Sequence, residues 1–371
     1  MKRRGFIKSS LALAGAVGSL PLITSCAGVH RRSFAEFKKG DRMMDSAPKE
    51  LMEILNYGAL APSGHNTQPW LVKIISESEL VIQSDQSRWL PQVDPNNRET
   101  FLSLTAFAES IRLAARSSGW NAQIKRIADS RKDQDVFKIT LKRTSTTQQN
   151  DLQLLKQRST TRSNYETREI NNNTVMPLIG VDRNHVHYYP LQSHEGRWIA
   201  DNLPEAIKQQ SFNDAKQKEL AQWLRFSRDT AEKRQDGLTA EALGMNWMTR
   251  FIWYNFFNRD TAMGNSFRKK AVETAHDQVN HCSGFLVLTS QDDALKSHFE
   301  CGKLYQQISL KLTEMDMVHH TMSQLLEEEP WSSQIRTQLN LNDPVQFVIR
   351  VGYGEKARPS IRRPVKSFII E

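Results

Sequence analysis

Apolar positions along the chain follow two periods, one typical of helices and one typical of strands. Helical spacing appears over residues 46–61, where Leu51, Ile54 and Leu55 share a face, and over residues 99–118, which end at Gly119. Short runs rich in Val and Ile predict strands at residues 70–75, 80–84, 136–141, 284–290 and 345–352. The pattern therefore mixes both element types throughout.

Three further segments have helical patterns. Residues 151–157 open the second half of the chain, after the polar stretch 142–150, and residues 215–258 are largely helical with breaks near Gly237 and Gly244. The pair Ser297 and Glu300 has capping-box spacing and predicts the start of another helix. An aromatic cluster within residues 247–257 is typical of core packing or of a lid over a flat ligand: Trp247, Phe251, Trp253, Tyr254, Phe256 and Phe257.

Both halves run in the order helix, strand, long helix, strand. This repeat of elements, without a repeat of residues, predicts an α+β protein of two similar lobes packed against each other. We assign residues 45–150 to the first lobe and 151–371 to the second, with a helical lid insertion at about 212–262.

The N-terminal segment has the order of an export signal. Arg3 and Arg4 resemble a twin-arginine motif, an uncharged apolar run follows over residues 11–23, and residues 23–26 resemble a lipobox ending at Cys26. This predicts removal of residues 1–25, lipid attachment at Cys26, a polar tether over 26–44, and a periplasmic or outer-face location on a membrane. The alternative is an apolar N-terminal helix that carries two arginines by chance.

Charge and cysteine content exclude several classes of protein. The formal net charge of +9 falls to +5 without residues 1–25, which hold four basic residues and no acid. This mild excess suits anionic small ligands better than nucleic acid. The three cysteines include no C-x-x-C pair, which argues against a disulfide scaffold and a zinc knuckle. Neither a Walker A nor a G-x-G-x-x-G motif is present, and no metal site is predicted.

The loop over residues 61–70, Ala-Pro-Ser-Gly-His-Asn-Thr-Gln-Pro-Trp, is the first candidate binding segment. Gly64 permits close approach of the backbone to a ligand. Ser63, Asn66 and Gln68 offer hydrogen-bond donors and acceptors, a combination that can recognise the edge of a planar heterocycle. An ordinary polar turn is the alternative.

Two basic segments are candidate phosphate sites. Arg158-Ser159-Thr160-Thr161-Arg162 places two guanidinium groups around hydroxyls, and Arg362-Arg363 follows Ser360 near the C-terminus. Guanidinium groups and hydroxyls together suit a phosphate. The alternatives are a solvated basic turn and a solvated tail.

Together these motifs resemble one family. The loop at residues 61–70 is similar to the APS-x-x-N-x-QPW segment of the nitroreductase-like FMN oxidoreductases. Residues 94–99 resemble the following segment of the Acg-type branch, residues 223–226 and 236–238 its insertion, and residues 344–354 with 362–364 its C-terminal end. The resemblance covers roughly residues 45–370, and its first and last motifs are the specific ones.

The resemblance implies a fold and a cofactor. Members usually form dimers with flavin at the interface, so this chain would be a fused pseudo-dimer, monomeric, whose lobes each hold an antiparallel-rich sheet flanked by helices. It would hold one complete FMN site, because residues after Arg162 repeat no such loop. The implied cofactor-binding residues are Ser63, Gly64, His65 and Asn66 at the ring, and Arg158, Ser159, Thr160, Arg162 and one of Arg362 and Arg363 at the phosphate.

The sequence thus predicts an exported FMN-dependent oxidoreductase that reduces a small organic acceptor. Because a flavin carries the redox chemistry itself, we assign no catalytic side chain. The predicted partners are a small-molecule electron acceptor and, through the lipid, a membrane. The alternative is a protein that holds flavin without turnover, with its ring closed beneath the lid.

Overall fold

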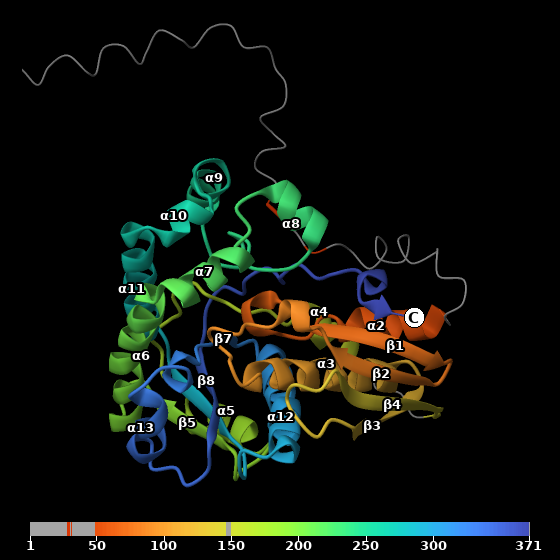
Figure 1. Ribbon diagram of the computed structural model, residues 1–371. Helices are drawn as coiled ribbons and strands as arrows, with labels where there is room; N and C mark the ends of the chain where they lie inside the picture. Colours follow the sequence, from red (N-terminus) through yellow and green to blue (C-terminus); the bar gives the residue numbers. More distant parts are fainter. Residues whose placement is uncertain (1–27, 30, 32–48, 146–149, 371) are drawn as a thin grey trace, which may run out of the picture.

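The computed structural model describes residues 28–29, 31, 49–145 and 150–370. Helices and two separate β-sheets make up an α+β fold, as the sequence predicted (Figure 1). The predicted signal, most of the tether and the first residues of the helix predicted over 46–61 lie outside the described residues. None of the helices in the described part of the chain combines the length and apolar character that crossing a membrane requires.

The first lobe is built on a five-stranded sheet of order β3-β4-β2-β1-β9. All its pairs are antiparallel except β1 with β9. Its elements before the second lobe are α2 (Lys49–Gly58), β1 (Trp70–Ser76), β2 (Glu79–Ser84), α3 (Arg98–Ser117), β3 (Trp120–Arg126), β4 (Asp135–Arg143) and α4 (Asn150–Gln157), with short 3-10 helices η3 (Gly64–Asn66) and η4 (Gln86–Arg88).

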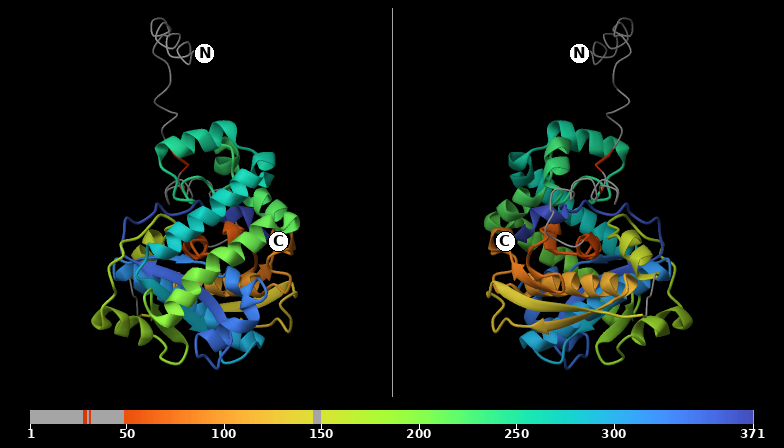
Figure 2. Two further views of the ribbon diagram at one scale, coloured as in Figure 1. Left: turned by 90° about the vertical axis from the view of Figure 1, so that its left-hand side faces the viewer. Right: turned by 90° about the vertical axis from the view of Figure 1, so that its right-hand side faces the viewer.

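The second lobe is built on a fully antiparallel four-stranded sheet of order β5-β6-β8-β7. Long helices α6 and α11 pack side by side against it (Figure 2). Its elements are α5 (Asn172–Ile179), β5 (Val186–Pro190), α6 (His194–Phe212), α11 (Asn265–Asn280), β6 (Gly284–Thr289), α12 (Leu295–Glu314), β7 (Val318–Thr321), η5 (Gln324–Leu326), α13 (Trp331–Gln338) and β8 (Val345–Gly352).

The lid is a run of shorter helices between α6 and α11. It contains α7 (Asp214–Trp223), α8 (Arg228–Arg234), α9 (Trp247–Phe256) and α10 (Arg259–Met263), which lie above the sheets in Figure 1. The predicted breaks are confirmed, since Gly237 and Gly244 have φ of 74° and 77°. Such left-handed conformations favour glycine and end helical segments.

The lobes meet along two long helices and through the C-terminus. Helix α3 packs against α12, where Gly302 allows close contact because a Cβ there would lie 2.7 Å from the Thr105 Cβ. The C-terminal segment then crosses to the first lobe through η6 (Val365–Ser367), and β9 (Ile369–Ile370) pairs with β1. Residues 365–370, assigned by sequence to the second lobe, thus complete the first lobe's sheet and core.

Most predicted elements are confirmed, and two details are wrong. The strands at residues 70–75, 80–84, 136–141, 284–290 and 345–352 correspond to β1, β2, β4, β6 and β8. Helix α2 ends at Gly58 rather than at residue 61. Helix α12 begins at Leu295, so Ser297 lies inside it and forms no capping box with Glu300. The Ser297 hydroxyl instead hydrogen-bonds Asp292, in the turn before the helix.

Candidate functional site

The loop between α2 and β1 holds an unusual backbone conformation. His65, Asn66 and Gln68 have φ of 47°, 54° and 54°, the left-handed region that residues other than glycine rarely adopt. The loop is held by the backbone N–H of Gln68, which donates to the Ser63 Oγ at 2.9 Å. Such a conformation persists where surrounding contacts impose it, and it is common at binding sites.

Asn66 is the contact point of three parts of the chain. Its buried amide Nδ2 donates to the carbonyl oxygens of Gly237 at 3.0 Å and Ile361 at 3.2 Å. Its Oδ1 accepts a hydrogen bond of 2.8 Å from the Arg362 guanidinium. Asn66 therefore fastens the loop to the lid and to the C-terminal segment, and it orients Arg362. Its contact with a ligand ring stays a prediction.

A cluster of three arginines, Arg31, Arg158 and Arg362, lies beside this loop. Arg158 and Arg362 are each 3% exposed, and both approach the carbonyl oxygen of Leu60, at 3.4 and 3.3 Å. Arg31 is part-buried and donates to the carbonyl oxygen of Lys156 at 2.7 Å. The sequence analysis placed Arg31 in the tether, whereas the structure places it in this cluster.

The arginine cluster carries buried positive charge without a carboxylate partner among the described residues. Burial first, and then neighbouring arginines, lower the pKa of Arg362 well below its ordinary value and that of Arg31 to about 10. The Nε and Nη1 atoms of Arg158 and the Nε of Arg362 are buried without a hydrogen-bond partner. Buried guanidinium donors that lack partners favour an anionic ligand.

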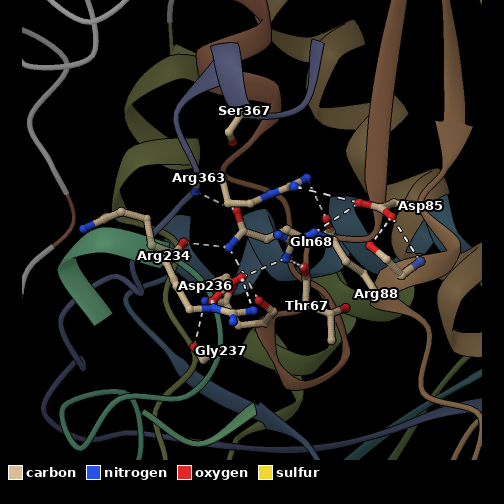
Figure 3. Close-up of polar contacts among 12 residues, drawn as sticks. Thr67, Gln68, Asp85, Arg88, Arg234, Asp236, Gly237, Arg363 and Ser367 are labelled. Carbon is tan, nitrogen blue, oxygen red and sulfur yellow. Dashed lines mark hydrogen bonds and ion pairs between the residues drawn. The ribbon is translucent and has the colours of Figure 1, made fainter. Parts of the chain in front are cut away.

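Arg363 belongs to a different network. It donates to the carbonyl oxygens of Gln68 at 3.0 Å and Trp70 at 2.8 Å, and its Nη1 lies 4.0 Å from the Asp85 carboxylate (Figure 3). These contacts attach the C-terminal segment to the first lobe. Of the two arginines left open by the sequence, the structure thus brings Arg362 to Arg158, while Arg363 lies against Gln68 and Asp85.

A buried carboxylate fastens the lid beside Arg363. Asp236 forms ion pairs with Arg225 at 2.6 Å, Arg88 at 2.9 Å and Arg234 at 3.1 Å (Figure 3). Burial opposes the charged form of Asp236, but the three guanidinium groups outweigh it and lower its pKa. Because Arg88 comes from the first lobe, this network ties the lid to that lobe.

A cavity of about 290 Å³ opens between the lobes, beneath the lid. This is close to the lower limit of roughly 300 Å³ for ligand pockets. Five of the predicted binding residues line it: Ser63, Gly64, His65, Thr160 and Arg162. Ser159 is buried beside Arg158 but does not line the cavity, and Arg162 donates to the carbonyl oxygen of Ala242 in the lid at 2.8 Å.

The histidines at the cavity are held neutral. Burial and then Arg162 lower the pKa of His65 to about 4, and the same two causes lower that of His320 well below its ordinary value. The Nδ1 atoms of both rings are buried without a hydrogen-bond partner. Neutral imidazoles next to buried arginines keep the site's positive charge on the guanidinium groups.

An acidic pair that the sequence did not predict lies in the cavity wall. Glu99, at the start of α3, and Glu327, after η5, both line the cavity and hydrogen-bond each other. Burial, and then the Glu99 carboxylate, raise the pKa of Glu327 well above its ordinary value, although Gln210 donates to its Oε2 at 2.7 Å. No local motif predicts this pair, because its members are 228 positions apart and come from different lobes.

We expect Glu327→Gln to remove a pH dependence of stability. Because the folded-state pKa is raised, Glu327 stabilises the fold at pH below about 4.5, and this contribution is lost as the pH rises toward the folded-state value. Wild type should therefore lose stability from pH 5 to pH 8 relative to the variant, whose glutamine at this position does not titrate. The difference in the free energy of unfolding, variant minus wild type, should increase over this range. Urea unfolding at both pH values measures it, with the exposed Glu205→Gln as control; equal differences at the two pH values contradict the assignment.

Other candidate groups lie apart from this site. Cys26 is outside the described residues. Cys282 and Cys301 are buried, and burial raises the pKa of the Cys282 thiol to about 11. Within the described ranges, no group of three or more His, Cys, Asp or Glu side chains is arranged to hold a metal ion.

Comparison with known proteins gives two relatives of interest. No family model matches the chain. "Uncharacterized protein Rv3127" of Mycobacterium tuberculosis is 24% identical over 332 residues, which is 83% of this chain and 89% of that protein. "Putative NAD(P)H nitroreductase Rv3131" of the same organism is 36% identical over 77 residues, 20% of this chain and 22% of that protein.

Two solved structures are also similar. A nitroreductase-like family protein from Bacillus cereus has a TM-score of 0.33 and 11% identity, covering 58% of this chain and 91% of its own. A nitroreductase with bound FMN from Bacteroides fragilis has a TM-score of 0.32 and 12% identity. The match covers 57% of this chain and 91% of that protein. At these values no functional assignment follows from them. Rv3131 and the two solved structures are described as nitroreductases or nitroreductase-like proteins, whereas Rv3127 is described as uncharacterized.

Proposed function

We propose that this chain binds FMN between its lobes and reduces a small organic acceptor, as an oxidoreductase of the nitroreductase-like kind. The observation that carries the proposal is the arginine cluster, in which the Nε and Nη1 atoms of Arg158 and the Nε of Arg362 are buried without partners and no described carboxylate pairs with the guanidinium groups. A phosphate matches this donor set. The adjoining cavity offers the space for a planar ring, with Ser63, Gly64 and His65 of the loop along its wall.

The residues present fit the parts of this cofactor. Arg158 and Arg362, with Arg31 beside them, would hold the phosphate, and Ser159 lies next to Arg158. Ser63, Gly64 and His65 would meet the ring from the loop. Thr160 and Arg162, which the motif assigned to the phosphate, line the same cavity from the second lobe and would meet the ring instead. When bound, the flavin supplies hydride or electron transfer, while the protein supplies orientation and charge.

The acidic pair adds a carboxyl group that can hold a proton at the site. Glu327 retains a proton at its carboxyl group to a higher pH than an ordinary glutamate does, and this group lines the cavity. Reduction of an organic acceptor consumes protons as well as electrons. Glu327 is therefore placed to hold a proton at the cavity wall, with Glu99 as its hydrogen-bond partner.

A second candidate function is flavin binding without turnover. It is favoured by the contacts that fasten the lid over the site. The lid carbonyls of Gly237 and Gln235 accept hydrogen bonds from Asn66 at 3.0 Å and Gln68 at 2.9 Å, and Asp236 pairs with Arg88. A lid held in this way would exclude large reductants and acceptors from the ring.

We expect one flavin per chain. Only one arginine cluster of this kind is formed by the described residues, and the left-handed loop beside it belongs to the first lobe. Protein expressed with added FMN should be a monomer in solution. On denaturation it should release about one flavin per chain. A ratio near two would contradict the single site, and a ratio near zero would contradict flavin binding itself.

Export and lipid attachment are also part of the proposal. They rest on the order of the twin arginines, the apolar run and Cys26. Fractionation of cells that express Cys26→Ala tests the attachment, because this variant lacks the thiol that the lipid would modify. A variant that distributes between membrane and soluble fractions as wild type does would contradict it.

A further inference from the structure

Helix α9 in the lid presents a large apolar face that no described element covers. Of its ten residues only Trp253 is buried. Trp247 and Phe256, near its two ends, are each 69% exposed, and the positions between them add Met248 at 55%, Phe251 at 46% and Ile252 at 42%. Half of the large apolar side chains that the described residues expose are on this one helix. Contiguous apolar surface of this kind marks an interaction site.

The composition of this face suits a bilayer surface. Residues 247–259 hold two arginines and no acid, so the segment is not repelled by anionic headgroups. Tryptophan at the helix start is typical of the boundary between headgroups and acyl chains, where its amphipathic ring is favoured. An interfacial helix buries its apolar face at that boundary, and α9 is held to the lid by its other side, through the buried Trp253.

The N-terminal segment joins the fold beside α9. The backbone N–H of Val29 donates to the Glu241 Oε1 at 3.1 Å, and the Tyr254 hydroxyl of α9 donates to the other oxygen of that carboxylate at 2.6 Å. A Cβ at Gly28 would lie 3.0 Å from the Arg250 Nη1, also on α9. Residue 26, the predicted lipid attachment site, is two positions earlier in the sequence.

We propose that the exposed face of α9 docks on a lipid bilayer, together with the lipid at Cys26. Residues 28 and 29 contact the same part of the lid as α9, so the described chain begins beside the helix that we propose to dock. Burial of the exposed α9 side chains would add apolar contact with the bilayer to that of the lipid. This inference goes beyond flavin binding and does not depend on it.

The test removes the apolar face and leaves the fold intact. The chain from residue 26 onward with Cys26→Ser, which lacks both the predicted apolar signal run and the lipid, is compared with the same chain carrying Trp247→Ser and Phe256→Ser. The matched control carries Ile75→Ser and Met176→Ser, each 50% exposed and away from α9. Co-sedimentation with vesicles of phosphatidylethanolamine and phosphatidylglycerol measures binding, and thermal unfolding confirms that all three proteins are folded.

We expect the α9 variant to bind these vesicles roughly tenfold or more weakly, because two large apolar side chains no longer enter the bilayer. The control should bind like its parent. Tryptophan emission of the parent should shift to shorter wavelength on binding, and the α9 variant should lose that shift. Unchanged binding, or an equal loss in the control, would overturn the proposal. Self-association of the parent in solution that the α9 variant abolishes, without vesicle binding, would assign the face to a second copy instead.

Discussion

Replacing Arg158 with methionine is expected to stabilise the flavin-free protein and to weaken FMN binding at the same time. The Arg158 guanidinium is buried, has no acidic partner among the residues that the structure describes, and lies near Arg31 and Arg362. Methionine fills similar space without the cost of burying an unpaired charge, and such exchanges stabilise folds by about 1–4 kcal/mol. Loss of a charge-assisted contact to phosphate costs about 1.5–3 kcal/mol, or roughly 10- to 150-fold in affinity.

The opposite signs of the two effects separate a binding role from a structural one. Urea unfolding of the flavin-free protein gives the first effect, and fluorescence titration with FMN gives the second. Arg350→Met is the matched control, because Arg350 is equally buried but donates to the carbonyl oxygens of Gln278, Thr161 and Ser163. That control should lose stability. An Arg158→Met protein that is destabilised, with unchanged FMN affinity, would show that the cluster is not an anion site.

Elements with strong local patterns were predictable from the sequence. Helix α3 has apolar residues at helical spacing and stops before Gly119, whose φ of 77° explains the termination. Strand β3, Trp-Asn-Ala-Gln-Ile-Lys-Arg, was missed although apolar and polar residues alternate along it, because it contains only one β-branched residue and no run of Val and Ile like those that predicted the other strands. The predicted capping box failed because the turn at Asp292 starts α12 two residues before Ser297.

The candidate site was predictable only where its residues form local sequence motifs. Residues 63–66 and 158–162 stand out as local motifs, and the structure brings several of them to one cavity. Contacts that depend on the tertiary fold left no such signal. The basic C-terminal segment was expected to be either a site or a solvated tail, and only the crossing to β1 buries Arg362 and Arg363. Arg31 and the Glu99–Glu327 pair depend equally on distant parts of the chain.

The Asp236→Asn variant is expected to release the lid. The exchange keeps the size of the side chain but leaves Arg225, itself only 2% exposed, without its ion-pair partner. Breaking a buried ion pair in this way costs about 3–5 kcal/mol. Because Asp236 also holds Arg88 of the first lobe, much of this cost should fall on docking of the lid. Trypsin should then cut at the exposed Lys233 and Arg234 at least tenfold faster, since cleavage follows the population of the open form.

The same variant decides between turnover and storage of flavin. Asp229→Asn, an exposed change of equal charge in α8, is the control for both measurements. If the lid closes the ring off, bulky reductants should bleach the flavin slowly in wild type and much faster in Asp236→Asn, which favours storage. If wild type is bleached as fast as the variant, the ring is already accessible through the cavity, which favours the oxidoreductase. Equal trypsin cleavage of Asp236→Asn and Asp229→Asn would show that Asp236 does not hold the lid, because the lost ion pairs would then have no effect on its opening.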